Sequence, residues 1–495
     1  MNEVISDLKE SFETCDDFIS KPIKIGMYKG FLLYLSDMAD LKKLAEIEKH
    51  LFSCYQPQQT QNILTLVGDR YPFSKSIDAD DTQAIITEIL SGNAVLYLDQ
   101  SPVAFSFSSA DTTGRKIDVP RTERTVRGPQ EGFVENIEKN LMLIRRKIRT
   151  SSLKVENLTL GKQTNTRISV VYIKGIANDE IVKEVHQRLS RINIDGILDS
   201  QYIESMIKDS PKSPFPTVYS TERPDRVCGS LLDGKVAILI DGTPFALTVP
   251  AMFVEFLHSS EDYYDGSLIA TSIRWIRFLG LFVVLILPAF YVAMATFHQD
   301  LLQTPFLIRI AASREGLPYP LLLEGIFMWL AYELIREAGL RMPKIFGGPV
   351  VTILGLVLIG QATVQAGLVG PVMAIVISVT ALTSFILPNY AFHQVIRFCG
   401  IPLLLLAGMF GFMGILVGLM FVLAHLVSIR SFGVPYFSPV SPARKESWKD
   451  VFIRAPWWAM ETRTAGIGVG NFQRSDDQNN AKPPKDSEEN HDEEK

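Results

Sequence analysis

Cysteine is scarce in this 495-residue chain, and its first half lacks any long hydrophobic run. The four cysteines are Cys15, Cys54, Cys228 and Cys399. Their scattered spacing excludes a C-x-x-C or zinc-ligand pattern and predicts free thiols in a reducing compartment. The chain also lacks H-E-x-x-H, G-x-S-x-G and dinucleotide-binding fingerprints. We therefore expect no enzyme activity, no catalytic residue, no metal and no cofactor.

The start of the chain, M-N-E-V-I-S-D-L-K-E, has neither a basic n-region nor an apolar h-region. It does not look like a secretory signal, so we expect the first half to stay in the cytosol. The net charge of −5 says little about partners, because much of the acid lies in the last residues of the chain. That polar, acidic tail cannot bury a core and is predicted to be disordered.

One stretch, Leu231–Pro250, has two possible interpretations. With Gly229 in front of it, its first part resembles a phosphate-binding P-loop, whereas its second part resembles two apolar strands around a D-G-T-P turn. A P-loop needs a Ser or Thr after its lysine and a helix behind it. Here Val236 follows Lys235, and the run V-A-I-L-I favours a strand. The pattern predicts a hairpin, with a nucleotide site as the minor alternative.

A gapless internal similarity supports the hairpin, because residues 89–107 align with residues 231–249. Leu90 corresponds to Leu232 and Gly92 to Gly234, and the Asp, Pro and Ala positions of the two segments also match. The earlier copy has no lysine at the position of Lys235, so a shared fold element explains the pattern better than a phosphate site. We predict a duplicated β-α-(…)-α-β-β unit, with chance similarity as the alternative.

The second half of the chain carries long uncharged runs at residues 278–297, 349–388 and 398–429. A bilayer core of roughly 30 Å needs about 20 apolar residues per helix, so these runs predict an integral membrane protein. Residues 319–334 form a further apolar segment that contains two glutamates. Arg274 and Arg277 precede the first run and agree with a cytosolic start.

The predicted fold class is therefore a soluble α/β N-terminal domain with two similar subdomains, followed by an α-helical multi-span membrane domain. The expected divisions are a first cytosolic subdomain (1–140), a second (141–270), a transmembrane domain of four to six spans (271–430), a basic and aromatic juxtamembrane segment (431–472) and a disordered acidic tail (473–495). Basic residues after the last run place the C-terminus in the cytosol too, which requires an even number of crossings. Either residues 319–334 do not cross fully, or residues 398–429 fold back near Gly411 and Gly414.

Several ordered motifs resemble one family. They read RTVRGPQEGFVENIEKNLMLIRRKIR, FPTVYSTERPDRV, VAILIDGTPFALTVPAMF, AASREGLPYP, ELIREAGLRMP, IGQATVQAGLVGP and RSFGVPYFSPVSP. Between Arg124 and Pro442 the chain resembles the A subunits of bacterial spore germinant receptors, the GerA family. The resemblance implies a role in germination in the spore inner membrane, beside a transporter-like B subunit and a lipoprotein C subunit. It also implies a homo-oligomer of A subunits that conducts ions, with no nucleic acid as partner.

Two acidic residues, Glu324 and Glu333, lie within the apolar segment 319–334. Ionisable groups inside a span cost at least roughly 2–3 kcal/mol, which makes both candidates for gating. Glu333 has an ordinary alternative, because Arg336 follows within one helical turn and could pair with it at the interface.

A second candidate face contains Gln361 and Gln365, with Val357, Val364 and Leu368 on the same side of a predicted helix. Amides beside a ring of Val or Leu are typical of a pore with a dewetting constriction. The alternative is that the two glutamines hydrogen-bond across packed helices. Trp457 and Trp458, beside basic residues, predict an interfacial belt.

The function predicted from these features is a receptor or channel subunit. One rival is a subunit of a secondary transporter, for which we would expect an inverted repeat between the spans. The other rival is a membrane-tethered NTPase, which Val236 and the duplicated hairpin disfavour.

Overall fold

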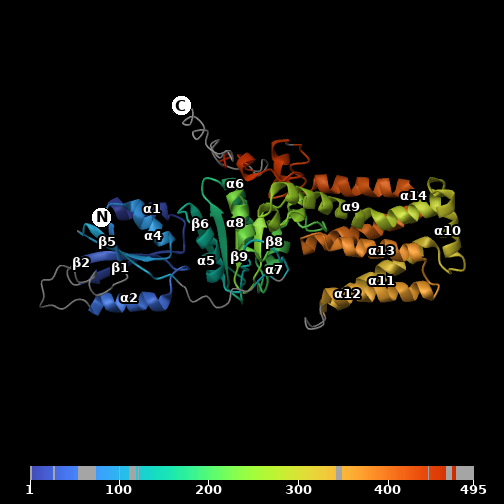
Figure 1. Ribbon diagram of the computed structural model, residues 1–495. Helices are drawn as coiled ribbons and strands as arrows, with labels where there is room; N and C mark the ends of the chain where they lie inside the picture. The colour runs from blue at the N-terminus through green and yellow to red at the C-terminus, as the bar shows by residue number, and fades with distance from the viewer. Residues whose placement is uncertain are drawn as a thin grey trace, which may run out of the picture.

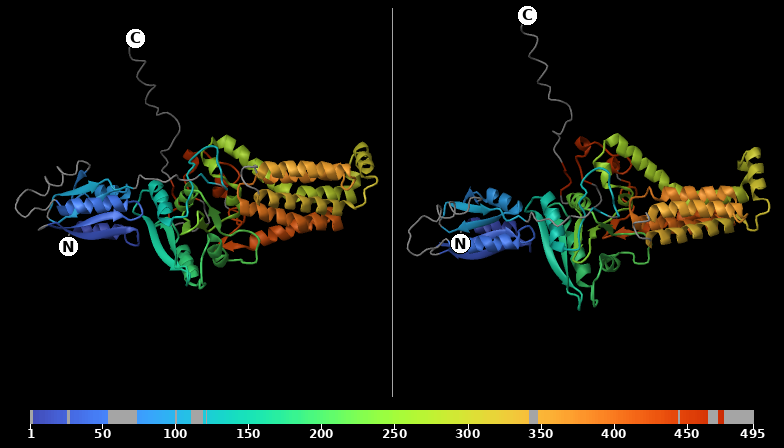
Figure 2. Two further views of the ribbon diagram at one scale, coloured as in Figure 1. Left: turned by 90° about the horizontal axis from the view of Figure 1, so that it is seen from below. Right: turned by 60° about the horizontal axis from the view of Figure 1, so that its bottom comes forward.

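The computed structural model of the chain describes residues 3–25, 28–53, 74–99, 101–110, 119–120, 122–341, 348–443, 445–463 and 471–474. Two α/β units and a helical bundle follow one another along the long axis of the molecule (Figure 1). The N-terminus lies at the end opposite to the bundle in every view (Figure 2). Cys54 and the acidic tail beyond residue 474 lie outside the described residues.

The first unit is an antiparallel sheet with helices on it. Its elements are α1 (Glu3–Ser11), β1 (Phe18–Ile25), β2 (Tyr28–Leu35), α2 (Leu41–Ser53), β3 (Ser74–Asp78), α4 (Thr82–Leu90), β4 (Ala94–Leu98) and β5 (Val103–Phe107). The strands are ordered β1-β2-β4-β5-β3, and every neighbouring pair is antiparallel. One face of the sheet packs on α1 and α4, and the other face packs on α2.

The second unit repeats this arrangement. Its elements are α5 (Ile137–Lys147), β6 (Leu153–Leu160), β7 (Thr166–Ile173), α6 (Asp179–Ser190), α7 (Ser200–Ile207), β8 (Tyr219–Thr221), α8 (Pro224–Leu232), β9 (Val236–Ile240) and β10 (Ala246–Val249). The strand order β6-β7-β9-β10-β8 matches the first sheet position by position. The repeated unit is larger than the predicted one, because it also contains a leading helix, a first edge strand and a short opposite edge strand.

The predicted hairpins are present in both units. β4 pairs with β5, and β9 pairs with β10, in antiparallel register. Gly92 and Gly234 occupy matching turns after α4 and α8, and both have φ of +86°, a backbone conformation that glycine adopts without steric cost. Lys235 precedes a strand, not a helix, so the stretch is not a P-loop.

The two units meet through α5. The predicted division between residues 140 and 141 falls inside this helix, but α5 packs on α8 and on the second sheet, so the second unit begins before Ile137. From α5, Arg145 reaches into the first unit and donates to both carboxylate oxygens of Asp17, at 2.9 and 2.8 Å. Both side chains are buried, so this bidentate pair fixes one unit against the other.

The helical bundle contains long helices that run beside one another (Figure 1). They are α9 (Ser267–Phe297), α11 (Leu321–Arg341), α12 (Gly348–Gln365), α13 (Pro371–Ser384) and α14 (Tyr390–Ser428), with the short α10 (Thr304–Arg314) at the far end. Among the described helices, α9 and α14 are long and apolar enough to cross a membrane by length and composition. A sheet-rich α/β region followed by a helical region with apolar helices confirms the predicted fold class.

The helix α14 reverses direction at Gly411. This residue has φ of +61° and ψ of −141°, which no helix allows. Beyond it, a Cβ atom on Gly414 would lie 2.1 Å from the carbonyl oxygen of Leu406, and one on Gly418 would contact Leu403 and Leu406. Residues 390–410 and 412–428 are therefore two antiparallel helices, which is one of the two alternatives that the sequence leaves open.

After the bundle, the chain returns to the second α/β unit. The short strands β11 (Arg430–Ser431) and β12 (Val434–Pro435) pair with each other, and Phe432 and Val434 join the core of the second unit. Two short helices, η5 (Lys445–Asp450) and η6 (Trp457–Ala459), follow. Two further short helices, η1 (Phe253–Leu257) and η2 (Ser260–Tyr263), link β10 to α9.

Candidate functional site

A buried ion-pair cluster joins the second α/β unit to the bundle. Arg274 and Arg277, on the first turns of α9, are only 1% and 6% exposed. Asp262 of η2 accepts from Arg274 Nε at 3.2 Å and from Arg277 Nη1 at 2.7 Å. Asp450 of η5 accepts from Arg274 Nη1 at 3.0 Å. We call these four residues the junction cluster; the two arginines that the sequence assigns to the cytosolic flank are thus paired inside the protein.

The junction cluster is coupled to its surroundings by aromatic groups. The hydroxyl of Tyr263 donates to Asp450 Oδ2 at 2.9 Å, and the guanidinium of Arg274 lies 5.6 Å from the centre of the Tyr263 ring. Burial and the positive charge of Arg274 hold the pKa of His258 well below its usual range, so its imidazole is neutral. The last residues of the second α/β unit, the C-terminal segment and α9 therefore form one hydrogen-bonded network.

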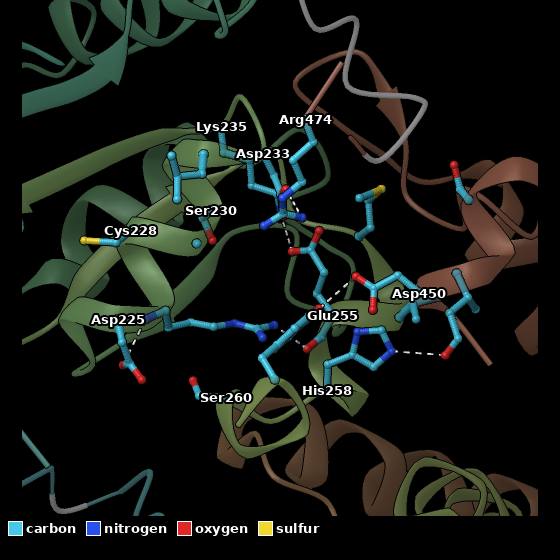
Figure 3. Close-up of a pocket in the computed structure, with 18 of the residues that line it drawn as sticks. Asp225, Cys228, Ser230, Asp233, Lys235, Glu255, His258, Ser260, Asp450 and Arg474 are labelled. Carbon is cyan, nitrogen blue, oxygen red and sulfur yellow. Dashed lines mark hydrogen bonds and ion pairs between the residues drawn. The ribbon is translucent and has the colours of Figure 1, made fainter. Parts of the chain in front are cut away.

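Beside this network lies a cavity of about 360 Å³, shown in Figure 3 and here called the junction cavity. One wall comes from α8 and the turn that follows it, and the opposite wall comes from η1, η2 and Tyr264. The C-terminal segment closes the cavity with residues of η5, Trp457 and Arg474. The volume lies at the lower end of the usual range for small-molecule sites.

The charged groups that line the junction cavity are mostly paired with one another. Lys235, the lysine of the P-loop-like stretch, is 3% exposed and forms an ion pair with Glu255. Arg474 lies 3.3 Å from Asp233, and its guanidinium stacks over the Trp457 ring. Trp457, which the sequence assigns to an interfacial belt, thus bounds a cavity.

The junction cavity also contains a cysteine, but its chemistry does not suit catalysis. Burial raises the pKa of the Cys228 thiol to about 12, so the thiol stays protonated and is a poor nucleophile. Cys15 and Cys399 are free thiols as well.

Within the bundle, Glu324 is completely buried near the far end of α11. Its Oε1 accepts from Arg314 of α10 at 3.0 Å, and its Oε2 accepts from the backbone N–H of Gly370 at 2.9 Å. This carboxylate therefore ties α10 and the turn between α12 and α13 to α11. It does not face an open channel within the protomer.

Glu333 lies nine residues after Glu324, in the second half of α11, and lines a pocket together with Pro214 of the second α/β unit. The predicted local pair with Arg336 is present at 3.0 Å. A second partner, Arg397 of α14, donates to Glu333 Oε1 at 2.6 Å and is 3% exposed. Glu333 thus links α11 to the first half of α14.

The five residues predicted to share one face of α12 differ in their exposure and position. Val357 is 55% exposed, Gln361 and Gln365 are exposed, and Val364 is half-buried against the cluster formed by α11 and α13. Leu368, which was expected on the helix, lies beyond its end: the N–H of Leu368 donates to the carbonyl of Thr363, as in a Schellman cap. Neither glutamine has a hydrogen-bond partner within the described residues, so their side chains do not bridge helices inside the protomer.

Sequence reasoning missed the partners of these candidates. The partners are charged residues that lie near or inside apolar segments, namely Arg314, Arg397 and Asp262. A charge in such a position is the one feature of the sequence that marks them as candidates for buried ion pairs. Their partners lie 10, 64 and 15 residues away, beyond the reach of local spacing rules.

Comparison with known proteins gives a consistent result. The family model "Bacillus/Clostridium GerA spore germination protein" matches residues 6–465. Spore germination protein KA of Bacillus subtilis (strain 168) is 40% identical over 467 residues, which cover 94% of this chain and 86% of that protein. The uncharacterized membrane protein YfkQ of the same organism is 36% identical over 475 residues, covering 96% and 92%.

Among solved structures, the crystal structure of the N-terminal domain of the A subunit of the Bacillus megaterium spore germinant receptor GerK3 is similar to this chain. The two share 32% identity with a TM-score of 0.39, over 50% of this chain and 94% of that one.

Proposed function

The chain belongs to the Bacillus/Clostridium GerA spore germination protein family, and on that basis we propose that it is the A subunit of a spore germinant receptor. In this proposal it is not an enzyme. It passes a nutrient signal to an ion-conducting pore, which several copies of the chain form together in the spore inner membrane. A transporter-like B subunit and a lipoprotein C subunit complete the receptor.

The course of the helices supports a bundle that crosses the membrane six times. α9 leads away from the α/β units, and α11, α12, α13 and the two halves of α14 follow in alternating directions. Glu324 near the start of α11 contacts Gly370 before α13, whereas Glu333, nine residues further along α11, contacts Arg397 near the start of α14. Both ends of the bundle then lie beside the second α/β unit, which fits a cytosolic N-terminal region and a cytosolic C-terminal segment.

The observation that carries the pore proposal is the exposed polar face of α12. This helix packs on α11 and α13, yet Gln361 and Gln365 stay exposed on the protomer. An amide that faces hydrocarbon without a hydrogen bond costs roughly 2–7 kcal/mol. Two such side chains at i and i+4 are stable if they line a water-filled axis that neighbouring copies enclose, with Val357 and Leu368 at its narrow points.

The junction cluster supports the transduction part of the proposal. Asp262 and Asp450 hold the first turns of α9 from two segments far apart in the sequence. A change in how the C-terminal segment sits on the second unit therefore acts directly on the start of α9. Such a packed, two-sided contact is suited to transmit a discrete movement.

A pair of leucine variants tests the pore proposal. Leu368→Ala shortens a side chain that is 37% exposed at the end of α12, and Leu382→Ala shortens one that is 47% exposed on α13. If Leu368 narrows a pore, its truncation widens the dry constriction, so the spores lose ions or germinate without nutrient. Leu382→Ala should behave as wild type.

Equal protein levels in the two strains, measured by immunoblot, make the comparison valid. Quiet Leu368→Ala spores, or the same leak in both variants, would remove α12 from the pore. Substrate-saturable transport by this chain alone would favour the rival transporter function.

A further inference from the structure

Arg226, on α8, makes no ion pair with any described carboxylate, although it lines the junction cavity. Its Nη2 donates to the backbone carbonyl of Glu255 at 3.0 Å, and its guanidinium lies 5.0 Å from the centre of the Tyr219 ring. Glu123 and Glu255 act on it only through space. A partly buried guanidinium without a counter-ion is an unusual arrangement, because desolvation penalises the charge.

All other charges of the cavity wall have partners. The lining cations Lys147, Lys235 and Arg474 pair with Glu131, Glu255 and Asp233. The remaining lining carboxylates, Asp225 and Asp450, pair with Arg223 at 2.7 Å and with Arg274 at 3.0 Å. Within the described residues, the wall therefore carries one charge without an ion-pair partner, and it is positive.

The free edge of Arg226 offers hydrogen-bond donors as well as charge. Its Nε and Nη1 groups have no hydrogen-bond partner within the described chain, and both atoms are accessible to solvent. This edge of a guanidinium matches two oxygens of a carboxylate or a phosphate. The anion would replace the missing counter-ion.

Further unused polar groups surround this edge. The hydroxyls of Ser230 on α8 and Ser260 on η2 line the cavity without a hydrogen-bond partner in the described part of the chain, and both are labelled in Figure 3. The ring of Trp457, 53% exposed, supplies an apolar surface on the side of the C-terminal segment. Polar groups that converge on one cation beside an aromatic ring are typical of a small-molecule site.

We propose that the junction cavity binds a small anion, with its carboxylate or phosphate group on the Nε and Nη1 edge of Arg226. The single unpaired charge selects one negative group, and a volume of about 360 Å³ limits the ligand to a small molecule. The bound molecule touches α8, η2 and the C-terminal segment together. It therefore stabilises the position of Asp450 and Tyr263, which hold Arg274 of α9.

The test is a binding measurement on the full-length chain in detergent micelles. L-lactate and inorganic phosphate are the probes, and L-lactamide is the neutral control with the shape of lactate. Isothermal titration calorimetry gives the affinity, and the shift of the unfolding temperature reports stabilisation of the folded state. We expect at least one of the two anions to bind and to raise the unfolding temperature, and lactamide to do neither. The tighter of the two anions identifies the acid group as carboxylate or phosphate.

Arg226→Gln should lower the affinity for that anion by roughly tenfold to a hundredfold, as expected for the loss of a charge-assisted bidentate contact. Lys147→Gln is the matched control, because Lys147 is a cation of the same wall that is already paired. Arg226→Lys and Ser230→Ala cover the case in which Arg226→Gln does not fold, and each should weaken binding several-fold.

Failure of both anions to bind would overturn the proposal, as would equal binding of lactate and lactamide. Unchanged affinity in the folded Arg226 variants, or an equal loss in Lys147→Gln, would overturn it too. The measurement needs neither ion conduction nor assembly, so its outcome is independent of the pore proposal.

Discussion

Replacing Asp262 with asparagine removes the carboxylate that two buried arginines share. The side chains of Asp262 and Arg274 are 1% and 0% exposed, and that of Arg277 is 8% exposed. Removing one partner of a buried pair costs about 3–5 kcal/mol, because the remaining charge stays buried without compensation. Arg274 keeps Asp450 at 3.0 Å, and Arg277 keeps the Leu257 carbonyl at 3.3 Å, so we expect the lower end of that range.

A loss of about 3 kcal/mol corresponds to a decrease of roughly 6–12 °C in the unfolding temperature of a unit of 150–250 residues. The assay is thermal unfolding of the full-length chain in detergent, together with hydrogen exchange at the start of α9. Asp265→Asn is the matched control, because Asp265 lies three residues further on and its ion pair with Arg127 is long, at 3.7 Å, with an arginine side chain that is 70% exposed. An exposed pair of this kind is worth at most about 1 kcal/mol.

Equal unfolding temperatures of Asp262→Asn and Asp265→Asn would refute this prediction. Additive effects of Asp262→Asn and Arg277→Met would refute it too. Two residues that form one buried pair must show an interaction energy in a double-mutant cycle.

Three further outcomes follow from buried or strained positions. Burial raises the pKa of Asp37 to about 7, so the folded state binds a proton that the unfolded state has already lost. The first unit should therefore lose stability as pH rises from about 4 to 7, and Asp37→Asn should flatten this pH dependence, measured by hydrogen exchange. Glu324→Gln leaves Arg314 without its carboxylate partner and should lower the free energy of unfolding by about 3 kcal/mol, measured by thermal unfolding in detergent. Gly411→Ala places a side chain on a residue with φ of +61°, and its Cβ atom would lie 2.8 Å from the His298 ring, so immunoblots should show less protein. Gly360→Ala is the control, because no atom lies within 4 Å of the added Cβ atom, and its protein level should equal that of the wild type.

The hairpins and the duplication could be predicted because their signals are local. Turn residues at fixed offsets, such as Gly92 and Gly234, specify backbone conformations that few other residues adopt. The outer strands gave no such signal. β1 contains Pro22, β3 is largely polar and β8 is only three residues long, so none shows a clear alternation of apolar and polar residues.

The candidate sites divide in the same way. The Glu333–Arg336 pair follows from a spacing of three residues, and an apolar run too long for one span makes the reversal at Gly411 one of two sequence-based alternatives. The pairs Arg314–Glu324 and Arg397–Glu333 depend on how helices pack, which spacing along one helix does not encode. The exposure of Leu368 at a cap depends likewise on where α12 ends.

Single-particle imaging of the full-length chain in lipid nanodiscs tests the central claim most directly. The account predicts a closed ring of several copies, with Gln361 and Gln365 of each α12 facing a central axis and Leu368 near its narrowest point. A particle with one copy of the chain, or a ring in which the glutamine face of α12 points to lipid, would contradict it.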